Sequence, residues 1–214
     1  MVDSGTNSTL ESEDSDISLS EFRARRNELF RRKADVLLSQ AEGNVLEEEI
    51  HKYETAGKHG HLYTDANATW QKKKTTFRYY GGGFRVGNAE LESSACIGVT
   101  NAFGCISISL EHRLSPEFKF PVAYENCWDA LLWLSKNAPA LGADLSKGFV
   151  VGGTSSGGHI ANPLVHRARD EGLQPPITGV HLTVAPTLAP QALTEAYRDI
   201  YKSRDALRDG YTLI

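Results

Sequence analysis

The chain has 214 residues, of which 40% are hydrophobic and 23% are charged, and its formal net charge is −4. These values are typical of one globular domain with a sizeable core. They leave no broad basic field for nucleic acid, and no apolar run approaches the roughly 20 residues that a membrane-spanning helix needs. We therefore expect neither a nucleic-acid partner nor a membrane span.

The first distinct segment covers residues 1–17. It is acidic and polar, large apolar groups are scarce, and residues 1–16 contain no Lys or Arg. This composition predicts a disordered acidic tail and does not fit a secretory signal. The three cysteines, Cys96, Cys105 and Cys127, are irregularly spaced within apolar runs. They indicate buried free thiols, and we expect a reducing, cytoplasmic location.

A helix is predicted in the second segment, residues 18–44. Ser18 and Glu21 form a capping box, apolar residues recur at helical spacing as far as residue 41, and Gly43 is a plausible stop. The opposite face is basic and carries Arg23, Arg25, Arg26, Arg31, Arg32 and Lys33. Such a face can contact acidic lipid or a partner protein, but it is more commonly solvated, and we favour the solvated face.

The next segment predicts a hairpin, with strands at residues 45–53 and up to residue 63, and a turn at residues 56–58. His59 and His61 form an H-x-H pair, and His51 lies nearby. Two histidines on one strand face can bind zinc, but no Cys, Asp or Glu motif supplies a further ligand. We therefore favour a polar hairpin over a metal site.

From residue 75 onward, strand and helix patterns alternate. Strands are predicted at residues 75–80, 105–110, 147–151 and 177–184, and helices at residues 90–103, 123–138 and 191–206. This alternation predicts a mainly parallel sheet of five or six strands with helices on both faces.

Residues 153–157 read G-T-S-S-G and fit the G-x-S-x-G pattern. They follow the apolar residues 149–151 and precede an amphipathic segment at residues 156–169, which is the strand–turn–helix context of a nucleophile elbow. In that turn Ser155 would take a strained backbone conformation at a helix N-terminus, where amide groups favour negative charge. The alternative is a Gly/Ser turn without chemistry.

Three consecutive glycines, residues 81–83, follow the strand at residues 75–80. Without side chains their backbone N–H groups stay accessible, which is what an oxyanion hole requires. A flexible glycine turn is the competing interpretation.

Three blocks of the sequence, taken in order, resemble the hormone-sensitive-lipase-like branch of the α/β-hydrolases, particularly its fungal esterase-like members. Residues 80–84 (Y-G-G-G-F) are similar to the family's H-G-G-G-F oxyanion segment. Residues 111–124 resemble its Y-R-L-A-P-E-x-x-F-P-A-A-Y loop and helix start, and residues 153–158 (G-T-S-S-G-G) resemble its G-D-S-A-G-G elbow. The resemblance covers residues 75–206.

This resemblance implies a three-layer α/β-hydrolase fold with a mainly parallel sheet, a cap-type helix at residues 18–44 and a hydrolase domain at residues 45–214. The implied activity is hydrolysis of small-molecule carboxylic esters, short-chain or aryl and alkyl, with no metal and no cofactor. The resemblance also implies that Ser155 is the nucleophile and that the N–H groups of Gly82, Gly83 and Ser156 form the oxyanion hole.

The sequence departs from the family at several points. Tyr80 stands where the family has His, and Thr154 stands where it has Asp. The family's triad runs Ser, then Asp or Glu, then His, but the segments that carry the acid and the base have no match after Ser155. His159, His166 and His181 follow Ser155, the first two within the predicted helix and the third within a predicted strand.

These departures lead to two main hypotheses, and a structural or scaffold role is a third and less favoured one. The first is a serine esterase represented by a shortened chain, with the fold incomplete at the C-terminus and the strand at residues 177–184 left as an exposed apolar edge. The second is a catalytically inactive binding protein, or a remnant of the same fold. In both, the loop at residues 111–121 supports the structure, with Arg113 and Glu117 holding it through hydrogen bonds or an ion pair.

Overall fold

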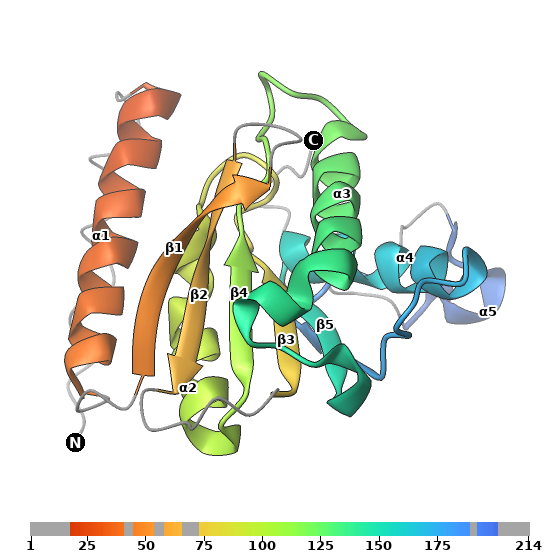
Figure 1. Cartoon of the computed structure of the whole chain (residues 1–214). Coiled ribbons are helices and arrows are strands. Elements are labelled where there is room, and N and C mark those ends of the chain that lie inside the picture. The colour runs from red at the N-terminus through yellow and green to blue at the C-terminus, as the bar shows by residue number, and fades with distance from the viewer. Residues whose placement is uncertain (1–17, 41–44, 54–57, 66–72, 189–191, 201–214) are drawn as a thin grey trace, which may run out of the picture.

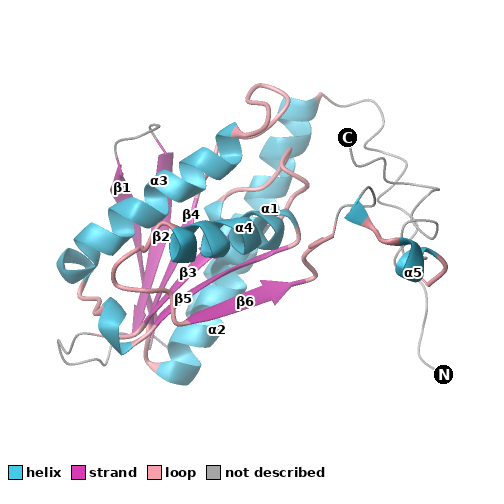
Figure 2. Cartoon of the chain, turned by 90° about the vertical axis from the view of Figure 1, so that its right-hand side faces the viewer, coloured by secondary structure: helices cyan, strands magenta, loops and turns pink. Residues whose placement is uncertain are grey.

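Six strands form one sheet in the order β1-β2-β4-β3-β5-β6. Figure 1 labels β1 to β5, and Figure 2 labels β6 beside β5. The computed structural model describes residues 18–40, 45–53, 58–65, 73–188 and 192–200. The strands are β1 (Val45–Tyr53), β2 (Lys58–Asp65), β3 (Thr75–Tyr79), β4 (Ile106–Leu110), β5 (Phe149–Thr154) and β6 (Gly179–Thr183).

The sheet divides into an antiparallel part and a parallel part. β1 and β2 form a hairpin, and β2 continues antiparallel to β4. β3 lies between β4 and β5 and is parallel to both, and β6 is parallel to β5. The carboxyl ends of β3, β4, β5 and β6 therefore meet at one edge of the sheet, which is where open α/β sheets bind ligands.

Helices cover both faces of the sheet (Figures 1 and 2). One face carries α2 (Ser93–Phe103), with α1 (Leu19–Gln40) packed beside it, and the other carries α3 (Val122–Asn137) and α4 (Ser156–Asp170). The short helical segments are η1 (Ala89–Glu92), η2 (Ala138–Leu141), η3 (Leu145–Lys147) and α5 (Glu195–Arg198). This arrangement is the three-layer α/β fold that the sequence predicts.

The main hydrophobic core lies between the sheet and helices α3 and α4. Every residue of β3 and of β4 is buried. Phe77 and Tyr79 point to the α3 side, where the Tyr79 hydroxyl donates to the carbonyl of Cys127 at 3.1 Å. A smaller cluster on the other face packs Leu37 and Leu38 of α1 against Tyr63, Cys96 and Ile97.

Most predicted elements are confirmed. The helix at residues 19–41 is α1, and the predicted hairpin is β1 and β2. The helix at residues 90–103 begins as η1, continues as α2 and ends at Gly104, which has φ 57 and so needs the left-handed region that glycine tolerates. The three cysteines are buried and free, as predicted.

Two predicted elements were wrong in extent. β5 begins at Phe149 and continues to Thr154, beyond the predicted end at residue 151, because Gly152 and Gly153 still pair in register with neighbouring strands. The charged helix expected at residues 191–206 amounts to the single turn of α5 within residues 192–200, where the side chains find no core to pack against.

Some expectations fall on residues that the structure does not describe. The acidic tail at residues 1–17 lies outside the described residues, and so do the side chains of His51 and His59. Within the described residues, no helix combines the length and the apolar character that crossing a bilayer requires.

Candidate active site

Three loops meet at the carboxyl edge of the parallel strands. We refer to residues 81–87 after β3 as the glycine loop, residues 111–121 after β4 as the proline loop, and residues 153–157 at the end of β5 as the elbow. Within the described residues, the non-glycine residues with positive φ all lie at this edge: Phe84 at 63°, Ser155 at 51° and Val184 at 45°. Such backbone strain clusters at functional sites.

Ser155 occupies the tight turn between β5 and α4. Its backbone has φ 51 and ψ −116, and it is the N-cap of α4. Its N–H donates to the carbonyl of Thr183 at 2.8 Å, and its carbonyl accepts from the N–H of His159 at 2.9 Å. The turn is thus held by β6 on one side and by the first turn of α4 on the other, and it places the serine at a helix N-terminus.

The elbow has no room for side chains at its flanking positions. A Cβ atom on Gly153 would lie 2.5 Å from the Tyr79 carbonyl oxygen, and one on Gly157 would overlap with it. A Cβ atom on Gly158 would lie 2.6 Å from Cβ of Ala185. These glycines let α4 approach the ends of β3 and β6, as the G-x-S-x-G-G pattern predicts.

The glycine loop lies directly beside the elbow. A Cβ atom on Gly81 would lie 2.9 Å from the Thr154 carbonyl oxygen and 3.3 Å from Cβ of Ser155. Gly82 and Gly83 have φ of 135° and 59°. Gly81 of the glycine loop and Gly153 of the elbow are 72 residues apart in the sequence. The two glycine turns are nevertheless neighbours in space.

Several backbone donors at this edge are available. In the described part of the chain, no hydrogen bond uses the N–H groups of Gly82, Gly83 or Ser156 as donors. The Ser156 side chain is buried, and its hydroxyl has no hydrogen-bond partner among these residues. Unpaired donors at a helix N-terminus and a glycine turn are suited to an anionic oxygen.

The histidines after Ser155 occupy different surroundings. The His159 ring packs edge-on against Phe84 and Tyr124, and burial lowers its pKa. His166 is exposed on α4, and Nδ1 of His181 lies 2.9 Å from Nη1 of Arg78. Over the residues that the structure describes, no hydrogen bond joins a histidine ring to the Ser155 hydroxyl.

Tyr80 and Thr154, the two residues that differ from the family's motifs, each contact neighbouring loops. Tyr80 is buried, stacks on the His112 ring at a centroid distance of 4.4 Å, and donates from its hydroxyl to the His112 carbonyl at 3.1 Å. This stacking joins the start of the glycine loop to the start of the proline loop. Thr154 ends β5, and its carbonyl oxygen faces Gly81.

The proline loop is held as predicted through Arg113 and Glu117, but by partners that the sequence did not indicate. Nε of Arg113 donates to Oδ1 of Asn126 at 3.0 Å, and its guanidinium stacks on Phe118. Glu117 pairs with Arg23 of α1 at 2.9 Å. The prediction of a solvated basic face was therefore wrong for Arg23 and also for Arg31, which pairs with Glu47 and Glu90.

A buried ion pair under the sheet was also missed. Nε of Arg78 on β3 lies 2.6 Å from Oε2 of Glu92, and both side chains are almost fully buried. Arg78, Gly152 and His181 are in register on adjacent strands, so the absence of a side chain at Gly152 lets Arg78 reach His181 across β5.

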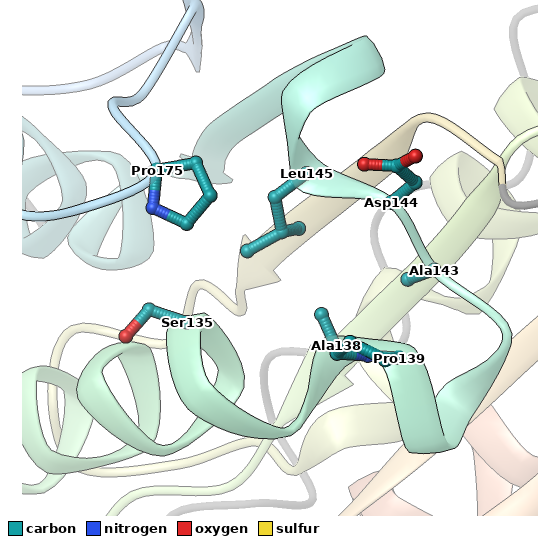
Figure 3. Close-up of a pocket in the computed structure, with 7 residues that line it drawn as sticks. All are labelled: Ser135, Ala138, Pro139, Ala143, Asp144, Leu145 and Pro175. Carbon is teal, nitrogen blue, oxygen red and sulfur yellow. The ribbon is translucent and has the colours of Figure 1, made fainter.

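A pocket of about 100 Å³ lies near the start of β5, and Figure 3 shows the residues that line it. It is lined by Ser135, Ala138, Pro139, Ala143, Asp144, Leu145 and Pro175. Leu145 precedes β5, whereas Ser155 follows it, and six strand residues span roughly 20 Å.

The described residues also contain no group of three or more His, Cys, Asp or Glu side chains arranged to hold a metal ion.

Comparison with known proteins identifies relatives of this chain. A family described as alpha/beta hydrolase fold matches residues 76–213. An AB hydrolase superfamily protein of Schizosaccharomyces pombe is 33% identical over 136 residues, which are 64% of this chain and 40% of that protein. Esterase LipI of Mycobacterium tuberculosis is 36% identical over 115 residues, which are 54% of this chain and 35% of that protein. The chain thus spans less than half the length of these two relatives.

The structural comparison agrees with the sequence comparison. The crystal structure of vibralactone cyclase superposes with a TM-score of 0.80 at 26% identity, and the match covers 92% of this chain and 60% of that one. The family match begins in β3, includes the glycine loop and the elbow, and extends over more than half of the chain. The chain therefore belongs to the α/β-hydrolase fold family, in its hormone-sensitive-lipase-like branch.

Proposed function

We propose that this chain carries the nucleophile and the oxyanion hole of a serine hydrolase that cleaves small-molecule carboxylic esters, short-chain or aryl and alkyl. The observation that carries the proposal is the position of Ser155. It lies in a positive-φ turn at the N-terminus of α4, against a glycine loop whose N–H groups are unpaired among the described residues. Membership of the α/β-hydrolase fold family and sequence similarity to a protein named an esterase support the same reaction.

The proposed reaction is acyl transfer. Oγ of Ser155 attacks the ester carbonyl carbon, and the N–H groups of Gly82, Gly83 and Ser156 stabilise the tetrahedral oxyanion. The C–O bond to the alcohol then breaks, the alcohol leaves with a proton, and water later hydrolyses the acyl-serine. Each donor of such a hole contributes about 3 kcal/mol to lowering the barrier.

The proton from Ser155 needs an acceptor, and no described histidine ring forms a hydrogen bond with the hydroxyl. Without a base the serine stays protonated at neutral pH and is a weak nucleophile. In the 214-residue chain we therefore expect slow acylation of Ser155 and turnover close to that of Ser155→Ala.

The cytoplasmic location remains part of the proposal, and the three buried free thiols support a reducing compartment.

The test is peptide mapping by mass spectrometry after incubation with p-nitrophenyl butyrate. We expect one butyryl group per chain on the peptide that contains Ser155, and none at that position in Ser155→Ala. Ser146→Ala is the matched control, because the side chain of Ser146 bonds to Asp144 near the start of β5 and to no other described residue. A folded chain that is never acylated at Ser155 would refute the proposal and favour a binding protein without chemistry.

A further inference from the structure

The guanidinium of Arg23 on α1 joins three segments that are distant in the sequence. Its Nε donates to the carbonyl of Arg85 at 2.7 Å, and its Nη2 donates to the carbonyl of Ser115 at 2.7 Å. Nη1 and Nη2 also bind the two carboxylate oxygens of Glu117 at 2.9 and 3.0 Å. One side chain thus connects α1, the glycine loop and the proline loop.

These bonds reach the part of the glycine loop that positions Gly82. The carbonyl of Gly82 accepts hydrogen bonds from the N–H groups of Arg85 and Val86, both at 3.1 Å. Arg85 is therefore part of the tight turn that fixes the peptide unit between Gly82 and Gly83, which carries the Gly83 N–H. Ser115 donates its N–H to the Phe84 carbonyl at 2.9 Å, so the proline loop holds the same turn from its other side.

An arginine suits this position better than any other residue. Its planar guanidinium can bind a carboxylate through two nitrogens and still donate to two carbonyl oxygens. Exposed ion pairs contribute little, but the Arg23 side chain is only 20% exposed, and two of its four bonds go to backbone carbonyls. These features distinguish Arg23 from Arg32, which is 75% exposed and pairs with Glu28 on its own helix.

The apolar attachment of α1 lies elsewhere on the helix. Ala34 is buried, and Leu37 and Leu38 pack against Tyr63 and Cys96 on the face that α2 covers. Arg23 is about three turns earlier in the helix. Because the packing does not depend on Arg23, its removal should release the loops while the helix stays attached.

We propose that Arg23 is a positioning residue, through which α1 holds the glycine loop in the geometry that presents the Gly82 and Gly83 N–H groups to the oxyanion. The inference rests on the proposed function of Ser155. A small misplacement of such donors reduces the rate of the chemical step and leaves substrate binding largely unchanged.

The experiment compares Arg23→Ala, Arg23→Lys and the control Arg32→Ala with the unaltered chain. The rate of Ser155 acylation by p-nitrophenyl butyrate is measured over a range of ester concentrations. For Arg23→Ala we expect the maximal rate to fall about 10- to 100-fold, with the half-saturating ester concentration within about twofold. Arg23→Lys keeps the positive charge but loses the planar guanidinium that binds two partners at once. We therefore expect its melting temperature to lie close to that of the unaltered chain while its acylation rate stays as low as that of Arg23→Ala. Arg32→Ala should behave as the unaltered chain.

Amide hydrogen exchange over residues 81–87 gives a readout that does not depend on chemistry. We expect faster exchange there in Arg23→Ala and no change in Arg32→Ala. Unchanged exchange in Arg23→Ala would overturn the inference, and so would faster exchange with an unaltered acylation rate. If the unaltered chain is never acylated at Ser155, the proposed function fails and the inference about catalysis fails with it. The exchange data then still show whether Arg23 holds the loop.

Discussion

The two strands that flank β5 differ sharply in their surroundings. Val151 on β5 pairs in register with Phe77 on β3 and with Val180 on β6. Phe77 and Val151 are fully buried, whereas Val180 is 47% exposed. The elbow therefore lies between a flank fixed by the core and a flank that is partly exposed, to which Ser155 is joined by its backbone bond to Thr183.

This difference shows where the precision of the site originates. The glycine loop follows β3, and Gly157 of the elbow packs against the Tyr79 carbonyl, so the core side sets the distance between the two turns. On the β6 side, the edge strand is exposed at Val180 and His181, which agrees with the exposed edge expected from the sequence. Substitutions on the β3 side should therefore lower the free energy of unfolding by more than matched substitutions on the β6 side.

The largest difference is expected between the two partners of Arg78. Glu92→Ala leaves the buried guanidinium without its carboxylate and should lower the free energy of unfolding by about 3–5 kcal/mol. His181→Ala removes the partner on the exposed strand and should lower it by less than about 1 kcal/mol. Urea unfolding of both variants checks this, and equal losses would contradict the contrast between the flanks.

The next effect concerns two helical glycines. Gly157→Ala forces a methyl group into the Tyr79 carbonyl and should lower the free energy of unfolding by about 3 kcal/mol or more. Gly98→Ala on α2 meets nothing within 4 Å and should raise it by about 1 kcal/mol through helix propensity. Thermal unfolding of the two variants gives the comparison. A Gly157→Ala protein as stable as the unaltered chain would mean that the close approach of α4 to β3 is absent.

A smaller effect separates the register partners Val151 and Val180. Val151→Ala removes buried methyl groups and should lower the free energy of unfolding by about 2 kcal/mol. Val180→Ala should lower it by less than about 1 kcal/mol, since its side chain is half exposed. Denaturant unfolding distinguishes the two, and a larger loss at Val180 would show that β6 is covered in solution.

The smallest effect is a dependence on pH at Glu117. Hydrogen bonds from Arg23 lower the pKa of this carboxyl group below its ordinary value. A depressed folded-state pKa contributes stability above the unfolded-state pKa, and this stability is lost as the pH falls through the folded value. Glu117→Gln should therefore melt below the unaltered chain at pH 7, and the gap should close in the acid range below about pH 4. A gap that is independent of pH would count against the ion pair.

The sequence predicts the parts of the site that are local. The elbow and the glycine loop are short motifs in which small residues are required by close backbone approach, so their placement at strand ends follows from the order of elements. β-branched and aromatic composition predicts the strand β3, and period-2 alternation predicts the strand β4, although neither predicts that every residue of these strands is buried.

The contacts that join these motifs could not be predicted from the sequence. Arg23 bonds to residues 62, 92 and 94 positions away, and its helix spacing alone placed it on the solvated face. Arg78 lies inside a strand of aromatic and β-branched residues. Its contact with His181 follows from the strand pairing, in which Gly152 lies opposite Arg78 on one side and opposite His181 on the other. Both are arginines whose partners are defined by tertiary packing.

The central claim is that Ser155 and the glycine loop form one oxyanion site. The most direct measurement is a crystal structure of the chain after reaction with a p-nitrophenyl alkylphosphonate, which leaves a tetrahedral adduct on a nucleophilic serine. We predict an adduct on Ser155 with its phosphoryl oxygen about 2.7–3.1 Å from the N–H groups of Gly82, Gly83 and Ser156. An adduct on Ser155 whose phosphoryl oxygen faces solvent, or an adduct on another residue, would contradict the account.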